Sequence, residues 1–288
     1  MSAAPARAPF GARLAAAMGE HGPLCVGIDP HASLLASWGL ADDVDGLRRF
    51  SLTVLEAVAG HVAAVKPQAA FFERHGSRGV AVLEEVVAAG RESGTLVIVD
   101  AKRGDIGSTM GAYADAFLRD GSPLAGDALT VSPYLGFGSL QPAVDLAAAT
   151  GRGLFVLCLT SNPEGGEVQH ARTAAHDGAS VAATMAAHAA RLNAGATPLG
   201  SVGLVVGATV GAAAQTTGTD LAAVNGPLLA PGVGAQGAGA AELAAVFGAA
   251  RGQVLASSSR GVLQAGPGVA GLRDAARRAG DEAGAALG

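Results

Sequence analysis

The chain has 288 residues, of which 50% are hydrophobic and 15% are charged, so it can bury a large core and lacks the composition of a disordered protein. Its formal net charge of -5 argues against nucleic acid as the main partner, because nucleic-acid-binding proteins present clusters of lysine and arginine. No apolar stretch reaches the roughly 18 residues that a membrane span requires. The opening MSAAPARAPF lacks the apolar core of a secretory signal, so we expect a soluble, cytoplasmic protein.

Eight short apolar runs follow one another along the chain, each followed by a turn signal: 23–29, 61–67, 95–102, 127–133, 153–160, 201–208, 226–232 and 252–259. Several are almost continuously apolar, which is typical of parallel strands buried on both faces. Between them lie segments with apolar positions at helical spacing, such as 79–93. Alternating strands and helices predict a parallel α/β sheet. Eight strands favour a closed (β/α)8 TIM barrel over an open doubly wound sheet.

No linker or break in composition divides the chain, so we predict a single catalytic domain, a barrel over residues 11–280. We expect residues 1–10 and the Gly/Ala-rich residues 281–288 to be mobile. The most polar long segment, 164–180, is a candidate lid, and an ordinary surface loop is an equally good interpretation. Cys25 and Cys158 each lie in an apolar run, which predicts buried thiols and neither a disulfide nor a metal site.

Charged residues gather where the first three runs end. Asp29 ends the first run, Lys66 the second, and Asp100 and Lys102 the third. The active site of a (β/α)8 barrel is built at the carboxyl ends of its strands. Side chains two residues apart on a strand share a face, so Asp100 and Lys102 should both point into the mouth of the barrel. Asp105 follows on the loop, within reach of the same lysine or of a neighbouring subunit.

The use of lysine at these strand ends is selective. The chain contains 19 Lys and Arg residues, and Lys66 and Lys102 are its only lysines. Arginine forms the better bidentate ion pairs and keeps its proton near neutral pH, whereas an ammonium can give its proton up. Lysine at both positions therefore suggests a proton donor or a compact point charge. The alternative is an ion-pair cluster that only holds a loop.

The last two runs predict a different chemistry. The seventh leads into APGVGAQG, residues 230–237, and the eighth into SSSRG, residues 257–261. Loops after strands seven and eight form the usual phosphate site of such barrels, because glycine lets backbone N–H groups approach the anion. Arg260 could clamp that anion. GVGAQG also matches the dinucleotide fingerprint G-x-G-x-x-G, but the chain after it is too short for a second βαβ half, so a phosphate loop is the better interpretation.

The sequence offers little support for a metal site. The seven histidines are scattered, and His31 is better explained as a loop residue than as a ligand. Asp29 and Asp100 could hold Mg²⁺, which stays open as an alternative. Ser161 and Asn162 follow the fifth run, where they could donate hydrogen bonds or simply form a turn.

Taken together, these stretches resemble the orotidine 5′-phosphate decarboxylase family, especially its longer bacterial branch. The resemblance runs from about residue 24 to residue 261 in the family's order, over GIDPH, VKPQAAFFE, VDAKRGDIGST, TVSPYLG, LTSNPEG, APGVGAQG and SSRG. The D-x-K-x-x-D core is quite specific, and the phosphate loop alone is less so.

The resemblance implies a reaction and a role for each matching residue. The reaction is decarboxylation of orotidine 5′-phosphate to uridine 5′-phosphate, the last step of de novo UMP synthesis, with no cofactor and no metal. Lys66, Asp100, Lys102 and Asp105 would form a charged tetrad in which Lys102 is the proton donor. The substrate would be bound by residues spread over the other loops: ribose by Asp29, the pyrimidine ring by Ser161, and phosphate by Pro231, Gly232, Gln236 and Arg260.

The resemblance also implies a homodimer, because Asp105 and Thr109 of each subunit would reach the partner's active site. Three rival functions stay open from the residues themselves. The chain could be a Mg²⁺-dependent sugar-phosphate decarboxylase of a related barrel or a Schiff-base aldolase, since a lysine at the barrel mouth suits that chemistry. It could also be a non-catalytic sensor of a nucleotide or sugar phosphate.

Overall fold

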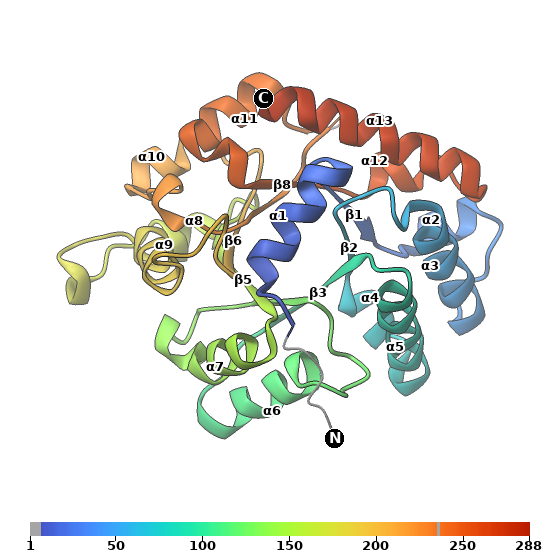
Figure 1. Ribbon diagram of the computed structural model, residues 1–288, viewed down its shortest axis with the longest axis horizontal. Coiled ribbons are helices and arrows are strands. Elements are labelled where there is room, and N and C mark those ends of the chain that lie inside the picture. Colours follow the sequence, from blue (N-terminus) through green and yellow to red (C-terminus); the bar gives the residue numbers. More distant parts are fainter. Residues whose placement is uncertain (1–6, 235–236) are drawn as a thin grey trace.

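The computed structural model describes residues 7–234 and 237–288 of the chain. Its centre is a closed barrel in which each strand pairs in parallel with the next and the last pairs with the first (Figure 1). The eight strands are β1 Leu24–Ile28, β2 Ala64–Pro67, β3 Leu96–Arg103, β4 Ala128–Val131, β5 Gly153–Leu159, β6 Val202–Val206, β7 Leu228–Pro231 and β8 Val254–Ser258. Each lies within one of the predicted runs or extends one residue past it, so the predicted (β/α)8 barrel is confirmed.

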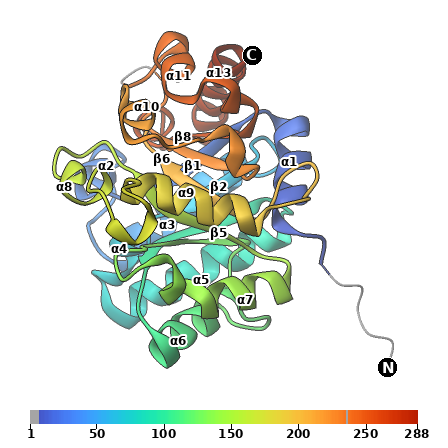
Figure 2. The ribbon, with the colours of Figure 1, turned by 90° about the vertical axis from the view of Figure 1, so that its left-hand side faces the viewer.

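Helices surround the barrel and fill every connection between strands (Figures 1 and 2). The α-helices are α1 Phe10–His21, α2 Ala32–Ser37, α3 Val44–Val58, α4 Ala69–Glu73, α5 Gly76–Glu92, α6 Gly107–Leu118, α7 Gln141–Thr150, α8 Gly165–Gln169, α9 Val181–Leu192, α10 Ala213–Thr217, α11 Ala240–Phe247, α12 Arg260–Leu263 and α13 Val269–Leu287. Short 3₁₀ helices are η1 Phe137–Leu140, η2 Ala174–His176, η3 Ala222–Val224 and η4 Gly248–Gln253. None of the described helices is long and apolar enough to cross a membrane.

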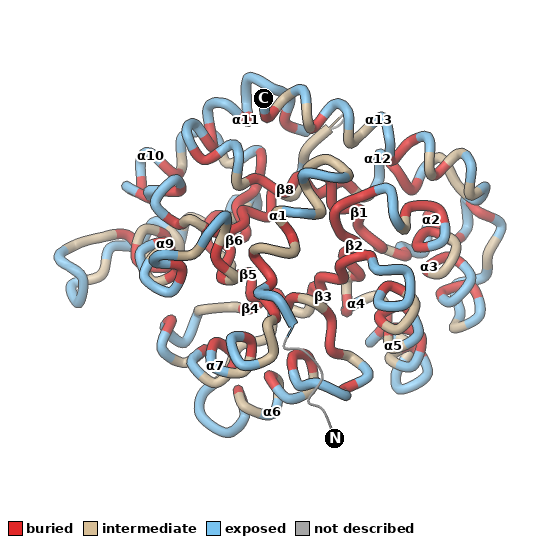
Figure 3. Tube along the Cα trace, viewed as in Figure 1, coloured by how far each residue is buried: buried red, intermediate tan, exposed pale blue. Residues whose placement is uncertain are grey.

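The outer helices bury one apolar face each against the strands, which are buried on both sides (Figure 3). In α5, the predicted helix at 79–93, the buried positions Val82, Leu83, Val86 and Val87 recur at helical spacing. Asp43 caps the start of α3, and its carboxylate accepts a hydrogen bond from the Gly46 N–H at 2.8 Å. That contact satisfies one of the amide groups left unpaired at a helix start.

A second core lies inside the barrel, and α1 crosses one end of the barrel and closes it (Figure 1). Phe10 and Leu14 of α1 are fully buried, and the Phe10 ring meets Phe155 edge to face at 5.9 Å. Arg13 pairs with Asp127, just before β4, which places α1 at the amino ends of the strands. Burying a side chain of this size contributes about 1.5–3 kcal/mol. The barrel is therefore sealed at one end and open at the other.

Parts of both segments that were expected to be mobile belong to helices in the structure. Residues 1–6 lie outside the described part, but Phe10 begins α1 and is buried. Residues 281–287, expected to form a mobile tail, continue α13, with Ala283 and Leu287 buried. The alanines of this segment favour a helix, and packing of its apolar side chains against the barrel adds to that preference.

The seam between the first and last strands brings the two ends of the sequence together. Leu24 pairs with Ala256, Cys25 with Ser257 and Val26 with Ser258. Gly27 allows this close approach, since a side-chain carbon there would lie 2.0 Å from the Ser259 hydroxyl. The loop that starts at Asp29 therefore lies beside the loop that carries Arg260.

Candidate active site

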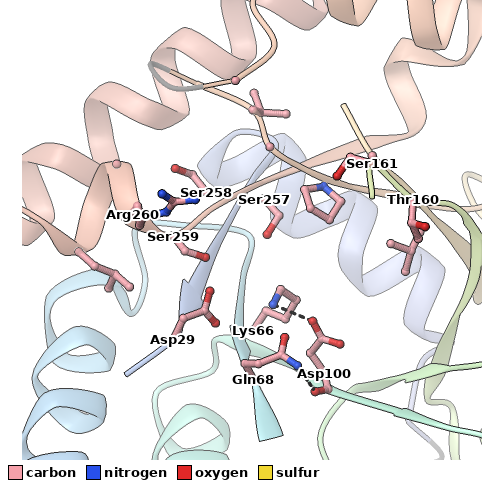
Figure 4. Close-up of a pocket in the computed structure, with 18 of the residues that line it drawn as sticks. Asp29, Lys66, Gln68, Asp100, Thr160, Ser161, Ser257, Ser258, Ser259 and Arg260 are labelled. Carbon is pink, nitrogen blue, oxygen red and sulfur yellow. Dashed lines mark hydrogen bonds and ion pairs between the residues drawn. The ribbon is translucent and has the colours of Figure 1, made fainter. Parts of the chain in front are cut away.

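A cavity of about 450 Å³ opens at the carboxyl ends of the strands. Its charged lining residues are Asp29, Lys66, Asp100, Lys102 and Arg260, together with His31. In Figure 4, Lys66 and Asp100 meet at one side of the cavity, and Arg260 lies with Ser258 and Ser259 at another. Because carboxyl ends of parallel strands meet at one rim, residues far apart in sequence share this space.

Asp100 lies between the two lysines of the chain. Its Oδ2 accepts a hydrogen bond from Lys66 Nζ at 2.9 Å, and its Oδ1 accepts one from Lys102 Nζ at 2.6 Å. Lys66 and Asp100 are 5% and 6% exposed, whereas the Lys102 side chain is 42% exposed. The buried ion pair thus carries a second, accessible ammonium at the cavity surface.

The charges of this cluster stabilise one another. Burial alone would raise the pKa of Asp100, but attraction to Lys66 and Lys102 outweighs it and lowers the pKa to about 2. Burial likewise acts to lower the pKa of Lys66, and attraction to Asp100 and then to Asp29 reverses this and raises it. Both groups are therefore charged at neutral pH, and both carboxylate oxygens of Asp100 already contact an ammonium that would compete with Mg²⁺.

Lys102 does not reach the cavity by simple alternation along a straight strand. The register of β3 against β4 runs from Val99↔Leu129 to Arg103↔Val131, so β3 carries extra residues in a bulge. Lys102 has φ of 47°, a left-handed conformation that is uncommon outside glycine. The predicted meeting of Asp100 and Lys102 at the mouth is observed, but an irregular backbone produces it.

Asp29 lies on the seam side of the cavity. Its Oδ1 is buried and has no hydrogen-bond partner among the described residues. A buried carboxylate oxygen without a partner is costly, so this position favours a ligand that donates a hydrogen bond. His31 lines the same region and packs edge to face on Phe71 at 4.2 Å. The described part of the chain contains no cluster of three or more His, Cys, Asp or Glu side chains suited to a metal.

Three of the four predicted phosphate-binding residues line the cavity. Pro231 and Gly232 line it, and so do Arg260, Ser257, Ser258 and Ser259, which are labelled in Figure 4. Gly232 has φ of 92°, which only glycine adopts without strain. Gln236, predicted to bind phosphate, lies outside the described residues.

The remaining predicted site residues divide into two groups. Ser161 lines the cavity from the end of β5, as predicted. Asp105 and Thr109 do not line it; they lie on the turn into α6 and its first residues, where Asp105 Oδ1 accepts a hydrogen bond from the N–H of Ile106 at 2.8 Å. Ile106 beside them is 62% exposed, so this turn lies at the surface of the chain.

A second cavity of about 640 Å³ adjoins the first and shares Lys102, Leu157 and Thr160 with it. Part of its wall comes from the 164–180 segment, which contains α8, η2 and an antiparallel bridge between Arg172 and Ser180. The segment is therefore partly helical. Its closing over a ligand stays a prediction.

Sequence reasoning missed several polar residues of the site. Gln68, Thr160 and the three serines at 257–259 line the cavity, and Thr130 lies directly behind Asp100. Gln68, Thr160 and the three serines lie within two residues of a predicted strand end. Thr130 is the one polar residue inside its strand. Strand-end placement was the available signal, but it does not separate a ligand contact from an ordinary turn residue.

The chain matches the family model described as orotidine 5′-phosphate decarboxylase / HUMPS over residues 22–275. An orotidine 5′-phosphate decarboxylase of Streptomyces coelicolor is 67% identical to this chain, in an alignment that covers 94% of this chain and 95% of the relative. The enzyme of the same name from Salinispora arenicola is 64% identical, and its alignment covers 93% of this chain and 95% of the relative.

Solved structures agree with these relatives. A crystal structure of a candidate orotidine 5′-phosphate decarboxylase from Streptomyces avermitilis has a TM-score of 0.93 at 65% identity, covering 98% of this chain and 97% of that one. The OMP decarboxylase of Leishmania donovani has a TM-score of 0.72 at 32% identity, covering 97% and 98%. This chain is thus a carbon–carbon lyase and belongs to the orotidine 5′-phosphate decarboxylase / HUMPS family.

Proposed function

We propose that the chain converts orotidine 5′-phosphate to uridine 5′-phosphate and carbon dioxide without a cofactor. The observation that carries the proposal is the Lys66–Asp100–Lys102 array at one side of a cavity that has Arg260 and a glycine loop at another. The relatives at 67% and 64% identity bear the name of this activity. A substrate with a phosphate at one end and a carboxylated ring at the other matches both parts of the cavity.

Lys102 supplies the proton that the reaction needs. When the bond between C6 and the carboxylate breaks, carbon dioxide leaves and the electron pair stays on C6, where no neighbouring group can delocalise it. An ammonium already fixed beside C6 stabilises that charge and then transfers its proton to the carbon. Lys102 is the more accessible of the two lysines, which suits this role. Solvent then restores the proton on Lys102.

Asp100 and Lys66 hold this donor in place. Asp100 pairs with Lys102 at 2.6 Å, and the buried Lys66 keeps Asp100 ionised from the other side. The ionised Asp100 would lie near the leaving carboxylate. When carbon dioxide leaves, the negative charge of the substrate carboxylate is no longer beside Asp100.

The rest of the cavity binds the nucleotide. Arg260 and the backbone near Pro231 and Gly232, with Gln236, would hold the phosphate, far from the reacting carbon. The unpartnered Oδ1 of Asp29 would accept a hydrogen bond from a ribose hydroxyl. Ser161 would hydrogen-bond the pyrimidine ring.

We further propose that the working unit is a homodimer in which Asp105 and Thr109 complete the partner's site. Both residues lie off the cavity of their own chain, on a turn that also exposes Ile106. Tyr134 and Leu135 on the following loop are 76% and 52% exposed, and exposed apolar side chains favour an interface. Mixed Asp100→Ala and Asp105→Ala chains should regain part of the activity that each lacks. No recovery after verified subunit exchange would contradict shared sites.

The direct test is the ultraviolet absorbance of orotidine 5′-phosphate mixed with the purified protein and excess chelator. We expect conversion to uridine 5′-phosphate, with Lys102→Ala protein as the inactive control. No conversion with chelator, but conversion with Mg²⁺, would refute the cofactor-free reaction. Binding of uridine 5′-phosphate without turnover would instead support a sensor, and turnover of sugar phosphates alone would support a related lyase.

A further inference from the structure

The hydroxyl of Thr130 forms hydrogen bonds with both Asp100 and Lys102 of the charged cluster. Thr130 Oγ1 donates a hydrogen bond to Asp100 Oδ1 at 2.9 Å and accepts one from the backbone N–H of Lys102 at 2.9 Å. The residue is 1% exposed and does not line the cavity. Its side chain therefore touches the carboxylate and the lysine backbone, and it is placed too deep to contact a ligand in the cavity.

Both of these contacts occur at the bulge of β3. Between Val99↔Leu129 and Arg103↔Val131, Thr130 is the one β4 residue opposite Asp100, Ala101 and Lys102. The extra residues take the Lys102 amide out of the regular ladder, and the hydroxyl gives that amide an acceptor. A residue with positive φ costs on the order of 1–3 kcal/mol and persists only where its surroundings hold it. The Thr130 hydroxyl is one such restraint.

Thr130 is the one polar residue of β4, which indicates that its hydroxyl makes a required contact. The other strand residues, Ala128, Leu129 and Val131, are apolar and fully buried. Valine has nearly the shape of threonine and would pack equally well at this position. A buried hydroxyl is favourable only where it is hydrogen-bonded, and Thr130 makes both of its bonds to the Asp100–Lys102 pair.

We propose that Thr130 is a positioning residue that sets the geometry of the Asp100–Lys102 pair for proton transfer, an inference that rests on the proposed decarboxylation. Oδ1 of Asp100 accepts from Lys102 Nζ and from Thr130 Oγ1, so the hydroxyl fixes the direction in which the carboxylate presents itself to the ammonium. The same hydroxyl holds the backbone from which the Lys102 side chain starts. Removing it leaves one bond fewer to a charged group and a buried amide without an acceptor.

A graded series of substitutions tests this role. Thr130→Val keeps the shape and removes the hydroxyl, and it should lower kcat by about 10- to 100-fold, the equivalent of one lost hydrogen bond to a charged group. KM and the Kd for uridine 5′-phosphate should change by less than about 3-fold, because Thr130 does not line the cavity. Thr130→Ser keeps the hydroxyl and should restore kcat to within about 3-fold of the unmodified chain. Thr130→Cys, a weaker hydrogen-bonding group, should fall between them and replaces the valine variant if that chain does not fold.

These measurements distinguish a positioning role of Thr130 from a purely structural role. They also show whether a failure lies with this inference or with the proposed function. Unchanged kcat in Thr130→Val, or an equal loss in the serine and valine variants, would overturn the inference. A loss carried by KM with kcat unchanged would also overturn it. Failure of the unmodified chain to convert orotidine 5′-phosphate would count against the proposed function instead. A crystal structure of Thr130→Val gives an answer without turnover: we expect a displaced Lys102 ammonium, and an unchanged pair with Asp100 would refute the proposal.

Discussion

Because the ion pair between Lys66 and Asp100 is buried, removing one of its charges should lower the free energy of unfolding by a measurable amount. Asp100→Asn keeps the size of the side chain but removes its charge, leaving the Lys66 ammonium at 5% exposure without its nearest anion. Removing one partner of a buried pair costs about 3–5 kcal/mol, because the remaining charge cannot be hydrated. Asp29 also attracts Lys66, so we expect the lower end, about 3 kcal/mol of unfolding free energy at pH 7.

Urea unfolding followed by the fluorescence of Trp38 provides the assay. Trp38 is the only tryptophan, and its buried indole donates a hydrogen bond to the Leu263 carbonyl, so its signal reports loss of the folded barrel. The matched control is the double variant Lys66→Met/Asp100→Asn, which removes both charges and should recover most of the loss. Stability of Asp100→Asn equal to that of the unmodified chain would refute the reasoning. So would a double variant no more stable than the single one.

The same variant tests the lowered pKa of Asp100. A carboxylate whose pKa falls from 3.8 to about 2 on folding contributes stability that is complete above pH 3.8 and is lost as the pH falls toward 2. The amide that replaces the carboxylate in Asp100→Asn does not titrate. The stability difference between the unmodified chain and this variant should therefore shrink by about 1 kcal/mol between roughly pH 6 and pH 3. A difference that stays constant over this range would mean that the pKa of Asp100 is not lowered.

Three further substitutions separate the parts of the molecule. Lys102→Ala should lose turnover by several orders of magnitude and keep its affinity for uridine 5′-phosphate; near-normal turnover would remove Lys102 as proton donor. Arg260→Ala should mainly raise KM, by about 10- to 1000-fold for one charge-assisted phosphate contact, and a defect confined to kcat would contradict its role. Gly153→Ala places a carbon 2.1 Å from the Phe10 ring and should cost about 1–3 kcal/mol of stability with kcat unchanged; Phe10→Leu in the same chain should relieve the clash.

The strands and the central charges were predictable because each has a local signal. Buried parallel strands need continuous apolar runs, and all eight runs contain a strand. Once the runs form a barrel, geometry alone brings their carboxyl ends together, which is why Asp29, Asp100 and Arg260 line one cavity. The lysine count added a chemical reason to single out Lys66 and Lys102.

Other features depend on contacts that no local pattern encodes. The left-handed backbone of Lys102 is held by Thr130 from the next strand, and a lysine in a strand pattern gives no sign of it. The seal formed by α1 depends on where Phe10 packs, which periodicity does not specify. The last residues continue α13 and bury Leu287, a contact that the composition of the segment does not reveal. The position of Asp105 on the loop leaves both Lys102 and a neighbouring subunit within reach, and only the family resemblance favours the partner's site.

The seam between β1 and β8 sets when the protein can first act during its synthesis. Asp29 is translated early and Arg260 late, yet the pairing of residues 24–26 with 256–258 makes them walls of one cavity. A nascent chain that still lacks β8 has an open barrel and no Arg260, so its cavity is missing one wall. We therefore expect fragments that end before β8 to lack the complete cavity, however well the earlier strands pair.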